Sequence, residues 1–256
     1  MADLSGSVVI GKIVRSESHV RYTCQVYGQG EIAEPPEPAD YAFGSFVRVP
    51  LRAGLARADA TALPPRADIR DDGYGAARSP ATRPGSRQEP ECWAVGLIYD
   101  TILLNPAFGT LGPRLSNDEQ VELFSPDYVA ERAVLVSILL LGTMTPERGG
   151  GRERQGMRVA HGVPPLAPDL GAEVAALPEA DVRAFHHFAD LAAPGGARPY
   201  LHMGYLPHAV ALDNPLLPLA MLRTIERLEG LFPENAALLS IVKRNFAWRL
   251  KVQSAG

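Results

Sequence analysis

Histidine is the side chain that titrates nearest to neutral pH, and four of the six histidines of this sequence lie in its last third. His186 and His187 are adjacent in a predicted helix, with His202 and His208 further along. Adjacent helical residues point about 100° apart, so only one of the pair could share a face with a third metal ligand. No His-Glu-x-x-His spacing accompanies them. We therefore expect a partly exposed helix with polar side chains and no cofactor. The histidines also leave open an enzyme that binds a metal or a small molecule, which we rank third, after the two binding functions given below.

The two cysteines, Cys24 and Cys92, are too few and too far apart for a disulfide framework or a cysteine-rich zinc site. A nucleophilic cysteine needs a neighbouring base that forms the thiolate. Cys24 falls on the apolar side of an alternating segment, which favours a buried structural thiol. No catalytic residue is expected.

Basic side chains gather in two places where they could contact a partner protein or phosphate groups. One is a predicted flexible loop over 145–162, and the other is the last predicted helix. The eight candidate residues are Arg148, Arg152, Arg154 and Arg158 of the loop and Lys243, Arg244, Trp248 and Arg249 of the helix. Glu147 and Glu153 reduce the net positive charge of the loop. We therefore rank an accessory DNA-binding function second, after an interaction with a partner protein. Trp248 is the residue most expected to contact a protein, since tryptophan is enriched at interface hot spots.

Composition argues against several classes of protein. The 256 residues are 46% hydrophobic and 21% charged, which is ordinary for a soluble chain with a sizeable core. The net charge of −4 argues against nucleic-acid binding over the whole surface. The amino terminus lacks the features of a secretory signal, and the apolar run over 133–141 is shorter than the ~20 residues that span a bilayer. A cytoplasmic protein without a membrane span is expected.

Short strands and turns are predicted for most of the first 177 residues. β-branched residues and period-two alternation mark the segments 7–15, 19–28, 41–49, 92–104 and 134–142. The segment 92–104 forms either two strands or one strand with a bulge at Gly96. Residues 52–91 are rich in Ala, Arg, Asp, Pro and Gly, with Tyr74 as their one aromatic residue. We expect them to be a long disordered insertion.

The last third is predicted to be helical. Apolar residues at three- and four-residue spacing mark the segments 178–190, 214–229 and 233–250. A further short helix is expected to start at Ser125, because Pro126 follows in the first-turn position. The apolar faces of these helices must pack against the strand region or another subunit.

Five pieces of the strand region occur in the order of a known module. They are Ile10–Val14, Ala42–Val49, Trp93–Ile98, Leu139–Gly142 and the proline-rich return Val163–Val174. Together they resemble the HAS barrel, the small amino-terminal β-barrel of HerA-type hexameric DNA translocases and of the α and β subunits of rotary ATP synthases. The resemblance implies an α+β fold. A small antiparallel β-barrel would occupy residues 1–177, and a helical region would occupy residues 178–256.

The ATPase domain that follows the barrel in HerA-type translocases has no counterpart in this sequence. A phosphate-binding P-loop needs Gly-x-x-x-x-Gly-Lys-Ser/Thr after a strand, and the glycines that follow Gly142 lack the Gly-Lys-Ser/Thr end. In the family, such barrels form the rim of ring ATPases, mediate subunit assembly and dock an accessory nuclease. We therefore expect a non-enzymatic interaction or assembly protein, either a homo-oligomer or a partner of a separately encoded HerA-type ATPase.

Overall fold

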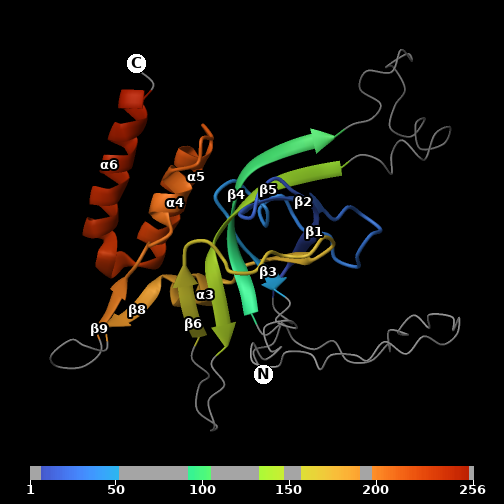
Figure 1. Cartoon of the computed structure of the whole chain (residues 1–256), viewed down its shortest axis with the longest axis horizontal. Helices are drawn as coiled ribbons and strands as arrows, with labels where there is room; N and C mark the ends of the chain where they lie inside the picture. The colour runs from blue at the N-terminus through green and yellow to red at the C-terminus, as the bar shows by residue number, and fades with distance from the viewer. Residues whose placement is uncertain (1–6, 52–91, 105–132, 147–156, 191–197, 254–256) are drawn as a thin grey trace, which may run out of the picture.

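The computed structural model describes residues 7–51, 92–104, 133–146, 157–190 and 198–253, and Figure 1 shows their arrangement. The strands are β1 (Val9–Ser16), β2 (Arg21–Val26), β3 (Phe46–Leu51), β4 (Cys92–Leu104), β5 (Ala133–Pro146), β6 (Met157–His161), β7 (Glu173–Ala176), β8 (His187–Asp190) and β9 (Arg198–Leu201). The helices are α3 (Glu179–His186), α4 (Leu206–Val210), α5 (Leu217–Leu231), the 3₁₀ helix η2 (Pro233–Asn235) and α6 (Ala236–Gln253). The predicted insertion over 52–91 and the predicted helix start at Ser125 lie outside the described residues.

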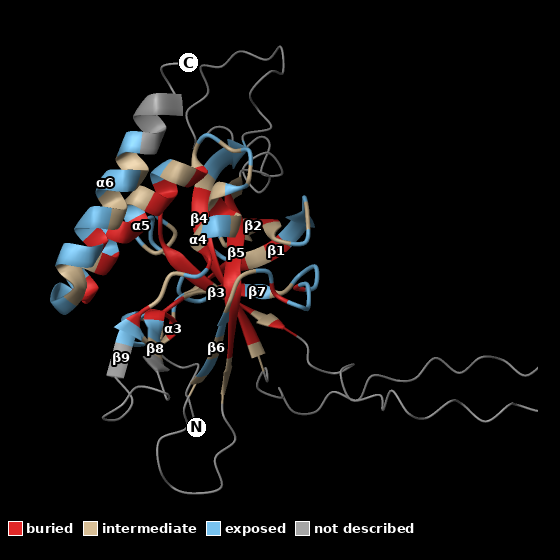
Figure 2. Cartoon of the chain, turned by 60° about the vertical axis from the view of Figure 1, so that its left-hand side comes forward, coloured by how far each residue is buried: buried red, intermediate tan, exposed pale blue. Residues whose placement is uncertain are grey.

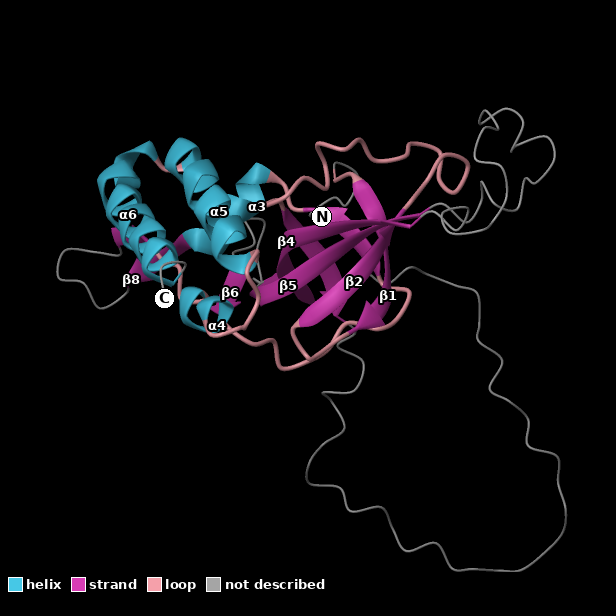
Figure 3. Ribbon diagram, turned by 90° about the horizontal axis from the view of Figure 1, so that it is seen from above, coloured by secondary structure: helices cyan, strands magenta, loops and turns pink. Residues whose placement is uncertain are grey.

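Six strands close into an antiparallel β-barrel. Their order is β2-β1-β7-β3-β4-β5, and pairing of β2 with β5 closes the ring. Every neighbouring pair in the ring is antiparallel. Figure 3 shows the barrel on one side of the molecule and the helices on the other. The predicted α+β fold, a closed antiparallel barrel followed by helices, is confirmed.

β5 is long enough to pair with two strands, β2 and β6, along one edge. Its first part pairs with β2 through residues such as Ser137, opposite Thr23, and closes the barrel. Its last part, from Gly142 onward, pairs with β6 and carries the sheet beyond the barrel. The prediction of a flexible loop over 145–162 is therefore wrong at both ends. Ladder bonds to β5 pair the main-chain groups on one side of β6, and the side chains of Met157 and Val159 pack against a hydrophobic core.

β4 is one continuous strand with local irregularities. Its register against β5 shifts between Val95 and Gly96, and again between Ile98 and Asp100. Of the two predicted alternatives, the single strand is confirmed, but the predicted bulge at Gly96 is wrong. The extra residue at the first shift is Leu141 of β5, and the extra residue of β4 is Tyr99 at the second shift. A Cβ atom at Gly96 would lie 2.5 Å from Cγ2 of Ile138, so a larger residue would force the barrel interior to move.

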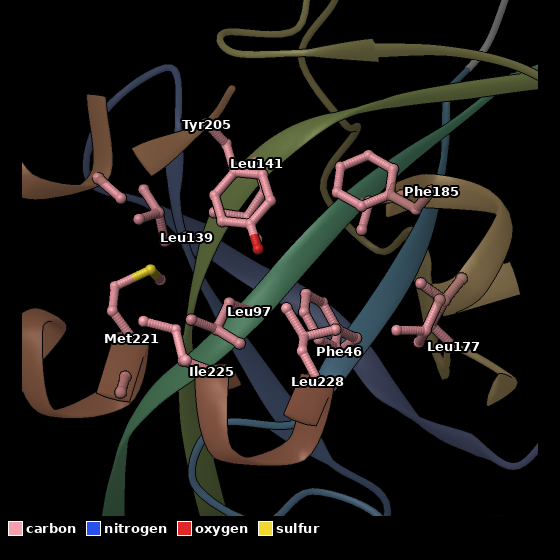
Figure 4. Packing of buried hydrophobic residues seen from close by; sticks show 14 of the residues in the cluster. Phe46, Leu97, Leu139, Leu141, Leu177, Phe185, Tyr205, Met221, Ile225 and Leu228 are labelled. Atoms are coloured by element: carbon pink, nitrogen blue, oxygen red, sulfur yellow. The ribbon is translucent and has the colours of Figure 1, made fainter. Parts of the chain in front are cut away.

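Two hydrophobic cores lie on opposite faces of the same strands. The barrel interior holds alternate residues of its strands, among them Ile10, Ile13, Cys24, Val47, Val49, Ala94, Ile98, Ile138 and Leu140. The outer face of β3, β4 and β5 forms a second core with the helices, and Figure 4 shows fourteen of its residues. The central strands are accordingly buried, as Figure 2 shows in red. Burial on both faces explains why the run over 134–141 is apolar at every position except Ser137 and does not alternate.

The barrel and the helical region share this second core. The predicted boundary between residues 177 and 178 falls between β7 and α3. Leu177 at that boundary belongs to the second core, together with Phe46 of β3 and Phe185 of α3. Burial of such large side chains stabilises a fold by about 1.5–3 kcal/mol each. The helices are thus held on the barrel by a continuous apolar layer.

The two long predicted helices are present as α5 and α6, with slightly shifted ends. The prediction of a helix over 178–190 is correct only as far as His186, because residues 187–190 form β8 and pair with β9. Phe188 of β8 packs its ring against that of His161, which contributes to holding the extended segment in place. Among the described residues, no helix has the length and the hydropathy needed to cross a membrane.

Candidate functional site

Three of the six histidines meet in one place, although they are far apart in the sequence. His161 of β6, His186 of α3, His202 after β9 and Tyr205 before α4 form what we call the histidine cluster. The ring centroid of His161 lies 6.1 Å from that of His186, 5.0 Å from that of His202 and 5.2 Å from that of Tyr205. The cluster joins β6 to α3 and to the segment that enters α4.

His186 is fully buried, and both of its ring nitrogens have partners. Nδ1 donates a hydrogen bond to the main-chain carbonyl of Val182 over 2.7 Å. Nε2 therefore carries the lone pair, and the hydroxyl of Tyr205 donates to it over 2.8 Å. Burial lowers the pKa of His186 to about 3, because desolvation disfavours the charged imidazolium. The ring is neutral at pH 7, with one defined tautomer.

His161 is held in the opposite tautomer. The amide of Gly204 donates to Nδ1 over 3.0 Å, and Nε2 donates to the carbonyl of Phe185 over 2.8 Å. Desolvation by burial lowers the pKa of His161 to about 4. The ring of His202 packs against His161 on one side and against Phe188, with centroids 4.6 Å apart, on another. The hydrogen bonds of His161 and His186 occupy all four of their ring nitrogens, so a metal ion would have to displace a structural bond.

The other histidines also make polar contacts between segments. Nε2 of His19 donates to the carbonyl of Pro164 over 2.7 Å, and Nε2 of His208 donates to the carbonyl of Leu140 over 2.9 Å. Nε2 of His187 lies 3.9 Å from Oε1 of Glu234. Within the described ranges, no group of three or more His, Cys, Asp and Glu side chains is arranged to hold a metal ion.

The predicted partly exposed position is wrong for His186, which lies in the second core. Its distant partner Tyr205 and the barrel strands around it supply the burial, so the helical spacing of residues 178–190 did not indicate it. The contribution of His161 was also missed, because its arginine-containing segment resembled a loop.

Cys24 occupies the predicted position for a structural thiol. Its side chain is fully buried inside the barrel, which confirms the prediction. Burial raises the pKa of Cys24 to about 12, so the thiol is protonated at neutral pH. Cys92 is half-buried at the start of β4, where its sulfur accepts a hydrogen bond from the hydroxyl of Thr145 over 3.3 Å.

The eight predicted contact residues differ in whether the structure describes them, in their exposure and in their ion pairing. Arg148, Arg152 and Arg154 lie outside the described residues, as does the side chain of Arg249. Arg158 is exposed on β6, while Arg244 and Trp248 are exposed on α6. Lys243 turns toward α5, where Nζ lies 3.2 Å from both Oε1 of Glu226 and Oε2 of Glu229.

Helix α6 has one apolar side in the core and another in solvent. Leu239 is buried in the second core, and Val242 and Phe246 pack against that core. On the opposite side Leu238 is 48% exposed, Ile241 is 49% exposed and Trp248 is 65% exposed. The spacings of three and seven residues place these three side chains on one side of the helix. Figure 2 shows this outward side of α6 in pale blue.

The described residues thus form a packed fold in which one side of α6 exposes large apolar side chains. A comparison with curated proteins found no match. The sequence does match the family described as "Domain of unknown function (DUF8166)", over residues 2–54 and 55–255. These two segments span nearly the whole chain, and the protein belongs to the DUF8166 family.

Proposed function

We propose that this protein is a non-enzymatic interaction module, in which the barrel and the helices form a scaffold that presents α6 to a partner protein. The observation that carries the proposal is the solvent exposure of Leu238, Ile241 and Trp248 on one side of α6. Single exposed apolar residues are ordinary on protein surfaces, whereas several large ones on one side of a helix, here with Arg244 and Asn245 between them, favour an interaction site. Trp248 is an apt anchor, because tryptophan is enriched at hot spots.

The scaffold supports binding by holding α6 in place before a partner arrives. Leu239 anchors the helix in the second core, and Lys243 forms ion pairs with Glu226 and Glu229 of α5. A preorganised helix loses little conformational freedom on association, so more of the apolar contact energy appears as affinity.

The class of partner is supported by the resemblance described above. HAS barrels form the rim of ring ATPases and mediate assembly, so a separately encoded HerA-type ATPase is our first candidate and a second copy of the chain is the alternative. The cytoplasmic location that we expect from the sequence is part of what we propose. Nucleic-acid binding has less support, because Lys243, one of its candidate contacts, is already paired with two carboxylates.

The proposal is tested by removing the apolar contacts of α6 together. A Leu238→Ser/Ile241→Ser/Trp248→Ala variant of the full chain is compared with the wild type by affinity purification and by size-exclusion chromatography with light scattering. We expect the wild type to recover a stoichiometric partner or to self-associate, and the variant to do neither. The matched control is Leu170→Ser, since Leu170 is 72% exposed in the loop before β7, outside α6. A wild type that stays monomeric and recovers no partner would overturn the proposal, as would full binding by the α6 variant.

A further inference from the structure

We infer that the exposed side of α6 binds an acidic amphipathic helix of another protein. This inference rests on the proposed function and specifies the chemistry of the partner. The surface consists of Leu238, Ile241, Arg244, Asn245 and Trp248, all exposed and all on one side of the helix, and we call it the α6 outer face. It combines an apolar row with one guanidinium group near its middle.

The charge of α6 is of one sign. The helix contains four basic residues, Lys243, Arg244, Arg249 and Lys251, and no aspartate or glutamate. Lys243 is paired with Glu226 and Glu229, so its charge is already balanced on the α5 side. Arg244 is exposed and, within the part of the chain that the structure describes, forms no ion pair. A carboxylate on the partner would complement Arg244 with a bidentate hydrogen-bonded pair.

The spacing of the apolar residues specifies a helical partner. Leu238, Ile241 and Trp248 form a row along the helix axis, and the opposite side of α6 packs on α5 and the second core. A third helix lying beside α6 would extend the α5–α6 layer by ordinary helix packing. Its own apolar residues at positions i, i+3 or i+4 and i+7 would meet this row, as in other helix-binding surfaces.

A second copy of this chain fits the α6 outer face less well. Antiparallel pairing of two α6 helices around the middle of the row would place Arg244 near Arg244 of the copy. Because α6 contains no aspartate or glutamate, neither helix would offer a carboxylate to Arg244 of the other. Like charges that face each other across an interface are unfavourable, and a partner with the opposite charge avoids them.

An anionic membrane surface is also a poorer fit. Glu226 and Glu229 of α5 pair with Lys243, so this cation is not available to anionic lipid headgroups. Asn245 lies within the apolar row, which weakens insertion into the acyl region. These two features favour a protein partner over a lipid partner.

Three synthetic helical peptides test the inference on the full-length chain. They share one leucine row at heptad spacing and differ only in the flanking residues, which are glutamate, glutamine or lysine. Binding is followed by Trp248 fluorescence, which should shift to shorter wavelength when the exposed indole is covered. Trp93 is only 8% exposed and contributes a constant background. We expect the glutamate peptide to bind at least about tenfold more tightly than the lysine peptide at low salt, as one charge-assisted contact allows.

A charge reversal identifies the residue that recognises the carboxylate. Arg244→Glu should remove the preference for the glutamate peptide and favour the lysine peptide. The matched control is Arg158→Glu, an exposed arginine on β6 outside the α6 outer face, which should keep the original preference. Both variants should keep the wild-type circular dichroism spectrum.

Each other outcome points to a different conclusion. Equal binding of the three peptides would overturn the acidic-partner inference and leave the proposed docking function in place. Self-association that Leu238→Ser abolishes would identify a second copy as the occupant, and a fluorescence shift only with phosphatidylserine-containing vesicles would identify a membrane; either would overturn the inference. If peptides, copies and vesicles all fail to change Trp248 fluorescence, the inference is wrong, whereas the proposed function is decided separately by the affinity purification with the α6 variant.

Discussion

The hydroxyl of Tyr205 donates a 2.8 Å hydrogen bond to Nε2 of His186, and both side chains are fully buried. The bond connects α3 to the start of α4 across the outer face of the barrel. It also defines the tautomer of His186, whose Nδ1 donates within its own helix to Val182. One polar contact therefore orients two segments that are separated by the β8–β9 hairpin.

Tyr205→Phe should destabilise the fold by about 1–3 kcal/mol, because Nε2 of His186 would remain buried without a donor. The free energy of unfolding is measured by urea denaturation monitored by circular dichroism. Tyr200→Phe is the matched control, since Tyr200 is 47% exposed, and it should change the stability by less than about 0.5 kcal/mol. Equal stability of both variants would show that the Tyr205 hydroxyl has no structural role.

The stability of the protein should fall as the pH is lowered from about 6.5 toward 4. Burial lowers the pKa of His161 to about 4 and that of His186 to about 3, whereas unfolded histidine titrates near 6.5. Below pH 6.5 the unfolded state therefore binds protons that the folded state does not bind. The loss can reach about 1.4 kcal/mol per pH unit for the fully buried His186.

The pH dependence is measured as the urea midpoint at several pH values between 7 and 5, a range above the titration of most carboxylates. His186→Gln should reduce the slope, because glutamine does not titrate. A midpoint that is constant over this range, or a slope unchanged in the variant, would contradict the assignment of neutral buried histidines.

Gly96→Ala should destabilise the barrel by about 1–3 kcal/mol through overpacking. The new Cβ would lie 2.5 Å from Cγ2 of Ile138 and 3.2 Å from Cγ2 of Val47. Thermal unfolding monitored by circular dichroism measures the effect. Gly230→Ala in α5 is the matched control, since a Cβ there would meet no atom within 4 Å. That variant should be more stable than the wild type by up to about 1 kcal/mol, and the prediction fails if the two substitutions act alike.

Cys92 should react with iodoacetamide in the folded protein, and Cys24 should not. Cys24 is fully buried and burial raises its pKa to about 12, whereas Cys92 is half-buried. Peptide mass spectrometry after limited alkylation at pH 8 reports the two sites separately. Both cysteines should react in 6 M guanidinium chloride, which serves as the control. Rapid native alkylation of Cys24 would show that the barrel opens readily or is packed differently.

Local patterns in the sequence determined five of the six strands of the barrel and the two long helices, but not β7, which begins inside the predicted proline-rich return. Alternation around Cys24 identified the strand face that enters the barrel interior. Three- and four-residue spacing identified α5 and α6. These features depend on residues within a few positions of one another, so the sequence displays them directly.

Contacts between distant segments decided the rest. β6 is a strand because β5 supplies its ladder partners, and α3 ends at His186 because the next residues pair with β9. The histidine cluster forms only when β6, α3 and the segment before α4 meet over the barrel. The sequence by itself singled out Trp248, but the packing of α6 on α5 decided which side of that helix faces solvent. Burial and charge pairing depend on residues that are far apart in the sequence. The spacing of residues within one segment therefore does not indicate them.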